Sequence, residues 1–229
     1  MAPIKLVIFD CDGVLVDSEI IAARVECTGY RRLGLDMEVD EFAARFCGKA
    51  SKAIRDEIET MLGHKVPEAA VSKIEAELVE AMKNEVEAIS GVRETVERLD
   101  LPVCVCSNSS PEHIEGVLKR VDFHGLFHPH LYSSKLVCPQ RPKPEPDIYR
   151  HAMREFGVSP RATAILEDSV SGVRAGVAAG GRVIGFTGGR HCHQGHGDDL
   201  SEAGAETVIR RHAELPKVIE ALGAWEGVS

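Results

Sequence analysis

The sequence predicts an α/β fold, a Rossmann-like parallel sheet with a helical domain inserted after the first strand. The first reason is a set of short apolar runs bounded by glycine, proline or charged residues: 4–9, 101–106, 162–166, 182–186 and the shorter 208–209. Segments of helix length separate these runs. Continuous rather than alternating apolar strands are typical of a parallel sheet that helices cover on both faces.

The second reason is the stretch after the first run, which has helical periodicity and many charges but no convincing strand. We expect four helices in it, with breaks near Gly34, Gly48 and residues 63–67. This pattern divides the chain into an α/β core and a helical insertion: residues 1–15 and 89–229 form the core, and residues 16–88 form the insertion.

Individual elements follow from the same patterns. Residues 68–86 predict one helix whose apolar residues recur at helical spacing and form a stripe: Val71, Ile74, Leu78, Val79 and Met82. A last helix is expected at residues 214–222. Cys104 and Cys106 alternate with valines inside an apolar run, so we expect them to be buried in a strand.

Composition limits the classes of function. The 229 residues carry a formal net charge of -9, which disfavours binding to nucleic acid or to an anionic membrane. Neither a membrane-spanning run nor a signal peptide is expected, because no apolar run approaches about 20 residues. Seven cysteines without metal-type spacing fit a reduced, cytoplasmic protein, and we expect a monomer or a weak homodimer.

Two carboxylates, Asp10 and Asp12, follow the first apolar run. Residues two apart at a strand end point the same way, so both are expected to face one site at the carboxyl edge of the sheet. Adjacent carboxylates repel each other unless a cation lies between them or one holds a proton. Either arrangement suits phosphoryl transfer, although an aspartate-rich surface turn explains this motif alone equally well.

Polar residues also follow the second apolar run, where Ser107 and Asn108 precede a predicted helix. Hydroxyl and backbone N–H groups at such a junction can bind an anion. An ordinary helix N-cap accounts for Ser109 or Ser110 but explains Ser107 poorly.

Further on, prolines on both sides of Lys143 restrict its backbone, which suits a lysine that neutralises a phosphoryl group. A loop lysine is, however, more often only solvated.

Glu167 and Asp168 follow the run at 162–166. With Asp10 and a carbonyl of Asp12 they can complete an octahedral oxygen site for a divalent cation. The alternative is that they only stabilise the N-terminus of the next helix.

These four motifs, in this order, resemble the haloacid dehalogenase superfamily over nearly the whole chain. Residues 10–19 are similar to its phosphatase and β-phosphoglucomutase-like branch, in which a helical cap domain follows the first strand. The resemblance implies a Mg²⁺-dependent phosphatase that hydrolyses a small phosphorylated metabolite, such as a sugar or sugar-acid phosphate, through an aspartyl-phosphate. It also implies the roles of the residues: Asp10 as nucleophile, Asp12 as general acid and then base, Ser107, Asn108 and Lys143 as phosphate ligands, and Asp10, Asp12, Glu167 and Asp168 as metal ligands.

Other functions are less consistent with the sequence. Asp12 favours phosphate esters over dehalogenase chemistry, in which no acid is needed to protonate a leaving oxygen. A β-phosphoglucomutase carries a lysine shortly after the serine that matches Ser107, and none occurs here. A non-enzymatic phosphometabolite-binding module predicts a damaged carboxylate set, yet Asp10, Asp12 and Asp168 are all present. The Gly-x-x-x-x-Gly-Lys-Ser/Thr loop of an ATP-driven enzyme is absent.

Two loops complete the expectations. Residues 46–51 resemble the cap loop that reaches the active site in related proteins, so Gly48 and Lys49 are candidates for substrate selectivity, although Lys49 can equally be solvated. Residues 191–196, which contain three histidines and Cys192, are interpreted as a mobile loop at the edge of the active site. We disfavour zinc there because no second ligand group follows at the usual spacing.

Overall fold

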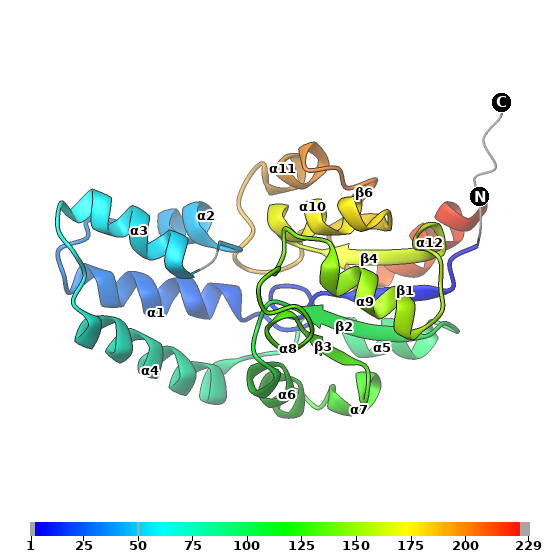
Figure 1. Ribbon diagram of the computed structural model, residues 1–229, viewed down its shortest axis with the longest axis horizontal. Coiled ribbons are helices and arrows are strands. Elements are labelled where there is room, and N and C mark those ends of the chain that lie inside the picture. The colour runs from blue at the N-terminus through cyan, green and yellow to red at the C-terminus, as the bar shows by residue number, and fades with distance from the viewer. Residues whose placement is uncertain (1–2, 50, 225–229) are drawn as a thin grey trace.

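The computed structural model describes residues 3–49 and 51–224, and its centre is a six-stranded sheet whose strands all run parallel (Figure 1). The strand order is β3-β2-β1-β4-β5-β6, so the first strand lies in the middle of the sheet. The strands are β1 Leu6–Phe9, β2 Val103–Ser107, β3 Leu131–Ser133, β4 Thr163–Glu167, β5 Arg182–Phe186 and β6 Thr207–Ile209. The predicted α/β, Rossmann-like fold is confirmed.

Helices cover both faces of the sheet, which explains why its strands are continuously apolar. Along β1, Leu6 and Ile8 pack into one layer, whereas Val7 and Phe9 pack into the other. The first layer contains α9 Asp147–Glu155, α10 Val170–Ala179 and α11 His196–Glu202. The second contains α5 Val92–Arg98, α6 Pro111–Arg120, α7 His124–Phe127 and α12 Leu215–Ala224. The remaining short elements are α8 Ser134–Val137, η1 Pro160–Ala162 and η2 His212–Glu214.

The edge strand β3 has no counterpart among the apolar runs of the sequence. It is three residues long, and Leu131 and Tyr132 are only half-buried. A three-residue strand with half-buried side chains gives no continuous apolar run, so hydrophobicity alone does not reveal it. Pairing with β2 defines it, with Ser107 opposite Ser133.

Four helices lie between β1 and α5 and form a block beside the sheet (Figure 1). They are α1 Glu19–Arg31, α2 Val39–Phe46, α3 Ser51–Leu62 and α4 Glu68–Glu85. Their own apolar core includes the buried Phe42, Phe46 and Ile58. The chain enters and leaves through a stem in which Val16 pairs antiparallel with Ala88. The domain boundaries at residues 16 and 88 remain a prediction.

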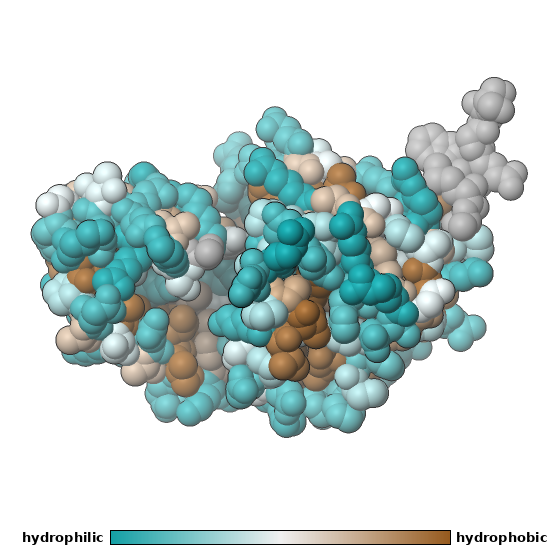
Figure 2. Space-filling view, viewed as in Figure 1, coloured by the Kyte–Doolittle hydropathy of each residue, from teal (hydrophilic) through white to brown (hydrophobic). Residues whose placement is uncertain are grey.

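The predicted apolar stripe of α4 is wrong at one position. Val79 is 54% exposed, whereas Ile74 and Met82 are buried and Ala81 is buried in its place. Val79 follows Ile74 by five residues, which places it about 140° around the helix from that side chain. Figure 2 shows a mostly hydrophilic face, with hydrophobic patches near its centre and on the helical block.

Two further expectations concern the whole chain. All seven cysteines are free thiols, and Cys104 and Cys106 are buried in β2 as predicted. Within residues 3–49 and 51–224, none of the helices combines the length and the apolar character that crossing a membrane requires.

The contact between α1 and α4 gives a test of the insertion. A Cβ at Gly29 would lie 2.4 Å from Cγ1 of Ile74, so Gly29→Ala forces the two helices apart. We expect a loss of about 1–3 kcal/mol in the free energy of unfolding from overpacking, measured by urea denaturation.

The matched control is Gly116→Ala in α6, where a Cβ would meet no atom within 4 Å. This change should be neutral or stabilise by about 0.5–1 kcal/mol, because alanine favours a helix. Equal losses in both variants would contradict the close α1–α4 contact.

Candidate active site

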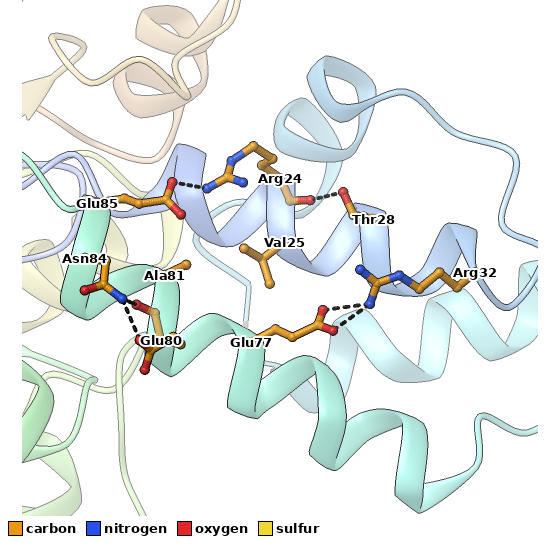
Figure 3. A pocket seen from close by; sticks show the side chains of 9 residues that line it. All are labelled: Arg24, Val25, Thr28, Arg32, Glu77, Glu80, Ala81, Asn84 and Glu85. Atoms are coloured by element: carbon orange, nitrogen blue, oxygen red, sulfur yellow. Dashed lines mark hydrogen bonds and ion pairs between the residues drawn. The ribbon is translucent and has the colours of Figure 1, made fainter.

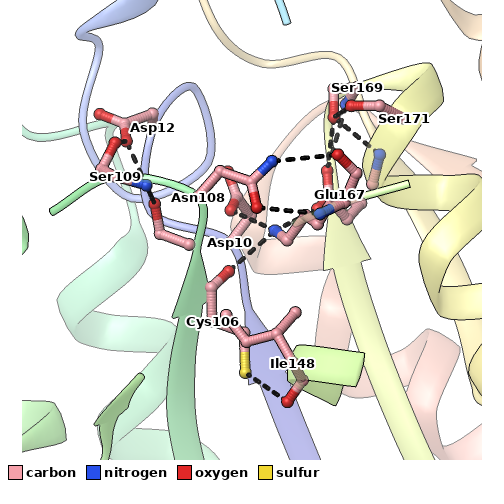
Figure 4. Close-up of polar contacts among 12 residues, drawn as sticks. Asp10, Asp12, Cys106, Asn108, Ser109, Ile148, Glu167, Ser169 and Ser171 are labelled. Atoms are coloured by element: carbon pink, nitrogen blue, oxygen red, sulfur yellow. Dashed lines mark hydrogen bonds and ion pairs between the residues drawn. The ribbon is translucent and has the colours of Figure 1, made fainter. Parts of the chain in front are cut away.

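Three neighbouring strands end at one edge of the sheet and carry most of the predicted residues there. Asp10 follows β1, Ser107 ends β2 and Glu167 ends β4, with Asp168 next in sequence. The parallel register places Phe9 opposite Leu166, so these strand ends lie side by side. Figure 4 shows Asp10, Asn108 and Glu167 lying close together at this edge.

The ammonium group of Lys143 occupies the centre of this cluster. Its Nζ lies 2.6 Å from Oδ1 of Asp10, 2.6 Å from Oε1 of Glu167 and 2.8 Å from the carbonyl oxygen of Cys106. Only 4% of the side chain is exposed, which excludes the solvated-lysine interpretation. Burial alone would lower the pKa of Lys143, but the charges of Asp10 and Glu167 outweigh burial and raise this pKa well above its ordinary value.

The side chain of Asn108 fixes the backbone that carries this lysine. Its Oδ1 accepts a hydrogen bond of 3.0 Å from the N–H of Lys143, and its Nδ2 donates one of 3.3 Å to the carbonyl oxygen. The sequence interpretation gave Asn108 only a backbone N–H for phosphate. Its amide instead links the end of β2 to the Lys143 loop.

Glu167 is fully buried and is held entirely by protein donors. Besides Lys143, the Tyr149 hydroxyl donates to Oε1 at 2.5 Å, and the N–H and Oγ of Ser169 donate to Oε2 at 3.2 and 3.1 Å. A Cβ at Gly172 would lie 1.9 Å from Oε1, so only glycine fits there. Its contacts therefore make Glu167 the partner of Lys143, whereas its assignment as a metal ligand remains a prediction.

Asp168, the residue after Glu167, is also buried. Its Oδ2 lies 3.0 Å from Nε2 of His191, a contact that the sequence does not reveal. A Cβ at Gly13 would lie 1.8 Å from the same oxygen, and Gly13 has a φ of +78°. Burial raises the pKa of Asp168, although the hydrogen bond and charge of His191 oppose that shift.

The carboxylates of Asp10, Glu167 and Asp168 fit a divalent cation. One oxygen from each lies within 4.8 Å of the others. Burial raises the pKa of Asp10 well above its ordinary value, Lys143 opposes the shift, and the charges of Glu167 and Asp168 add to it. One buried ammonium faces three buried carboxylates, so a hard cation such as Mg²⁺ would stabilise the ionised form of Asp10.

Asp12 lies at the same strand end but points to a different set of partners. Its carboxylate accepts hydrogen bonds from Ser18 and Ser109, both 2.7 Å, and lies 2.8 Å from Nε2 of His113. Burial alone would raise the pKa of Asp12. The charge and hydrogen bond of His113, together with the hydrogen bonds from the two serines, outweigh burial and lower this pKa below its ordinary value. Because β1 ends at Phe9, strand alternation does not extend to Asp12.

The serines after β2 divide between two roles. Ser107 is buried, and its Oγ accepts a hydrogen bond from the N–H of Ser109 and lies 3.4 Å from Oδ2 of Asp12. Ser110 is the N-cap of α6, where its side chain accepts from the N–H of His113. The N-cap interpretation therefore explains Ser110, while Ser107 is left beside the carboxylates.

The cap loop reaches this site through Gly48. Its N–H donates to Oε2 of Glu19 at 3.2 Å, its carbonyl oxygen accepts from Ser171 at 3.4 Å, and a Cβ would lie 3.0 Å from that of Ser169. Burial, followed by the charges of nearby aspartates, raises the pKa of Glu19 to about 7. Lys49 does not face the carboxylates, because its Nζ lies 3.1 Å from Glu57.

A surface hollow of about 320 Å³ lies away from this chemistry, between α1 and α4 (Figure 3). Its charged groups are already paired, with Arg32 Nη1 2.7 Å from both carboxylate oxygens of Glu77 and Arg24 bound to Glu85. The chemistry therefore lies at the sheet edge and not in this hollow.

Comparison with known proteins places the chain in a family. A family model for haloacid dehalogenase-like hydrolases matches residues 4–180. The 6-phosphogluconate phosphatase of Escherichia coli K12 is 30% identical over 227 residues, which cover 99% of each chain.

Two solved structures are also similar. A conserved haloacid dehalogenase-like protein of unknown function from Agrobacterium tumefaciens has a TM-score of 0.91 and 44% identity, over 96% of this chain and 99% of that one. A haloacid dehalogenase family hydrolase from Deinococcus radiodurans, with bound phosphate and sodium, has a TM-score of 0.83 and 32% identity over 100% of both.

The parallel sheet and the carboxylate–lysine cluster at its edge define an α/β enzyme with an acidic site suited to a cation. More narrowly, this chain belongs to the haloacid dehalogenase-like hydrolase family. The resemblance in the sequence and the expectation of a hydrolase related to phosphatases are thereby confirmed.

The close approach of Gly13 to Asp168 predicts the effect of a single methyl group. Gly13→Ala should displace the Asp168 carboxylate and raise the Mg²⁺ concentration needed for half-maximal activity by at least about tenfold, because the cation loses an oxygen ligand. Mg²⁺ titration by calorimetry and by phosphate release checks both effects.

Gly63→Ala is the matched control, because Gly63 also has a positive φ, +73°, but no atom lies within 4 Å of its would-be Cβ. Both variants incur a backbone strain of about 1–2 kcal/mol. An unchanged Mg²⁺ titration in Gly13→Ala would show that Asp168 is not a ligand at this place.

Proposed function

We propose that this hydrolase is a Mg²⁺-dependent phosphatase that cleaves a small phosphorylated metabolite through an aspartyl-phosphate on Asp10. The observation that carries the proposal is the position of Asp10, a buried carboxylate 2.6 Å from Lys143 Nζ and beside Asp168. A carboxylate in this setting has one oxygen bound by the lysine and a second with which to attack phosphorus.

Lys143 has two tasks in this mechanism. It favours the ionised form of Asp10 before attack, and it offsets the negative charge of the phosphoryl group during transfer. Glu167 keeps the ammonium in place, and Asn108 holds its backbone. Mg²⁺, when bound by Asp10, Asp168 and the carbonyl of Asp12, would supply further positive charge to the phosphoryl oxygens.

Asp12 is the proton carrier of the proposal. It gives a proton to the leaving oxygen and then takes one from the water that hydrolyses the aspartyl-phosphate. Its hydrogen bonds to Ser18, Ser109 and His113 keep it ionised and turned toward these donors. Rotation away from them leaves burial as the main influence, which raises the pKa of Asp12, so that the carboxylate takes up a proton from solvent before it acts as an acid.

We assign the substrate to the sugar and sugar-acid phosphates. Similarity to the E. coli 6-phosphogluconate phosphatase over the full length of both chains supports this class. The Deinococcus hydrolase, which contains bound phosphate and sodium, supports an anion and a cation site on this scaffold. The loop at Gly48 and Lys49 then contacts the part of the substrate remote from phosphorus.

A phosphate-release screen over phosphorylated sugars, sugar acids and polyols tests the proposal. Release that needs Mg²⁺ and stops with EDTA is the expected result. Conversion of a sugar phosphate into its isomer without release would identify a mutase, and binding without turnover would identify a non-enzymatic module.

Asp10→Asn should reduce turnover to less than about a hundredth of wild type, because a neutral amide cannot attack phosphorus. That ratio corresponds to about 2.7 kcal/mol in barrier height. Steady-state phosphate release measures it, with circular dichroism to confirm folding. The exposed Asp36 gives a matched control, since Asp36→Asn removes the same charge from the insertion surface. Higher residual turnover would exclude Asp10 as the nucleophile.

Lys49→Ala should lower kcat/KM for the best natural substrate much more than for p-nitrophenyl phosphate, which offers the cap little to contact. The matched control is Lys52→Ala, which removes an 85% exposed lysine from the start of α3, three residues further along the chain. Equal losses on both substrates would place Lys49 in the common chemistry. No loss on either would show that its pairing with Glu57 persists in the working enzyme.

A further inference from the structure

The loop between β5 and α11 is packed against the active site by two histidines. His191 is 4% exposed, and its Nε2 lies 3.0 Å from Oδ2 of Asp168. Nε2 of His196 lies 2.6 Å from the backbone carbonyl oxygen of the same aspartate. Both rings therefore bind one residue of the β4 end, and they bring the loop to the edge of the carboxylate cluster.

Cys192 lies between these rings. Its Sγ is 3.6 Å from Nε2 of His191, and one ligand atom from each of His191, Cys192 and His196 lies within 4.8 Å of the other two. In a tetrahedral zinc site, bonds of about 2.0–2.1 Å to nitrogen and about 2.3 Å to sulfur hold N and S about 3.5 Å apart. The His191–Cys192 pair already has this separation.

We propose that His191, Cys192 and His196 form a second metal site, which takes a thiophilic divalent cation such as Zn²⁺ with Asp168 as fourth ligand. Two imidazoles, a thiolate and a carboxylate are a donor set that zinc accepts and that Mg²⁺ does not favour. Metal binding removes the thiol proton of Cys192 and the Nε2 proton through which His191 binds Asp168, so that bonds to the metal replace that hydrogen bond.

The position of the fourth ligand in the chain explains why residues 191–196 alone do not predict the site. Residues 191–196 supply three donors within six positions, whereas Asp168 comes from a strand end more than twenty residues earlier. A second set in the same loop, His193, His196 and Asp199, also brings its ligand atoms within 4.8 Å. That set is more exposed and has no thiol, so the two can be separated by mutation.

A shared Asp168 gives the site a consequence for activity. A zinc ion that binds Asp168 withdraws this carboxylate from Asp10, and the proposed Mg²⁺ position loses a ligand. Zinc should therefore inhibit without occupying the Mg²⁺ position. This consequence rests on the proposed function, whereas metal binding by the four residues does not.

The binding test uses the full chain, freed of metal with EDTA and titrated with Co²⁺. Wild type should show a near-ultraviolet thiolate-to-cobalt charge-transfer band, which Zn²⁺ abolishes by displacement. Cys192→Ser should lose the band and bind Zn²⁺ at least about tenfold more weakly. Cys138→Ser, which removes another half-buried thiol, should match wild type. A band that survives in Cys192→Ser, or no band in wild type, would overturn the proposal.

Two further measurements complete the test. His193→Ala should leave zinc affinity within about twofold of wild type, and a large loss there with none in Cys192→Ser would assign zinc to the other set. With saturating Mg²⁺, zinc should inhibit wild type at a concentration at least about tenfold below that needed for Cys192→Ser. Equal inhibition of both would show that zinc acts in the Mg²⁺ position instead. If no phosphorylated substrate is cleaved, the cobalt band still decides the site.

Discussion

The ammonium of Lys143, buried between Asp10 and Glu167, is the interaction on which the rest of the site depends. A buried charge is tolerated only when it is paired and hydrogen-bonded, and this one has three acceptors within 2.8 Å. The surrounding residues serve the same pair. Asn108 holds the lysine backbone, and Tyr149 donates to Glu167. Removal of one partner would leave an uncompensated charge inside the sheet edge.

The single positive charge of Lys143 does not neutralise all the carboxylates of the site. The negative charge that remains is what suits the site to a cation. With Lys143 shared between Asp10 and Glu167, the charge of Asp168 is offset chiefly by His191. Two glycines allow the crowding, because Gly13 and Gly172 leave space that a Cβ would fill within 2 Å of a carboxylate oxygen. The fold thus concentrates negative charge at the sheet edge, where a hard cation can bind.

The sequence predicted the fold and the strand ends, because short apolar runs and the residues just after them are local signals. It did not find the three-residue β3, which pairing defines, and it placed Val79 on the wrong side of α4. Nor did it predict the contacts of His113, Tyr149 and His191, although it placed the loop of His191 at the edge of the site. These residues come from other elements, and their spacing in the sequence does not predict their contacts with the carboxylates of the site. Asp10, Lys143 and Asp168 were recognisable because each follows a strand or lies between prolines.

Asp168 shows how one carboxylate can belong to two chemical environments. On one side lie the oxygen atoms of Asp10 and Glu167, which suit a hard cation that prefers oxygen. On the other lies the imidazole of His191, which also contacts the Cys192 thiol, and these donors suit a softer cation. The carboxylate cannot fully satisfy both, so the position of the β5–α11 loop sets how much of its charge the active site receives. A loop that supplies none of the proposed catalytic groups thus contacts a carboxylate that the proposed Mg²⁺ site requires.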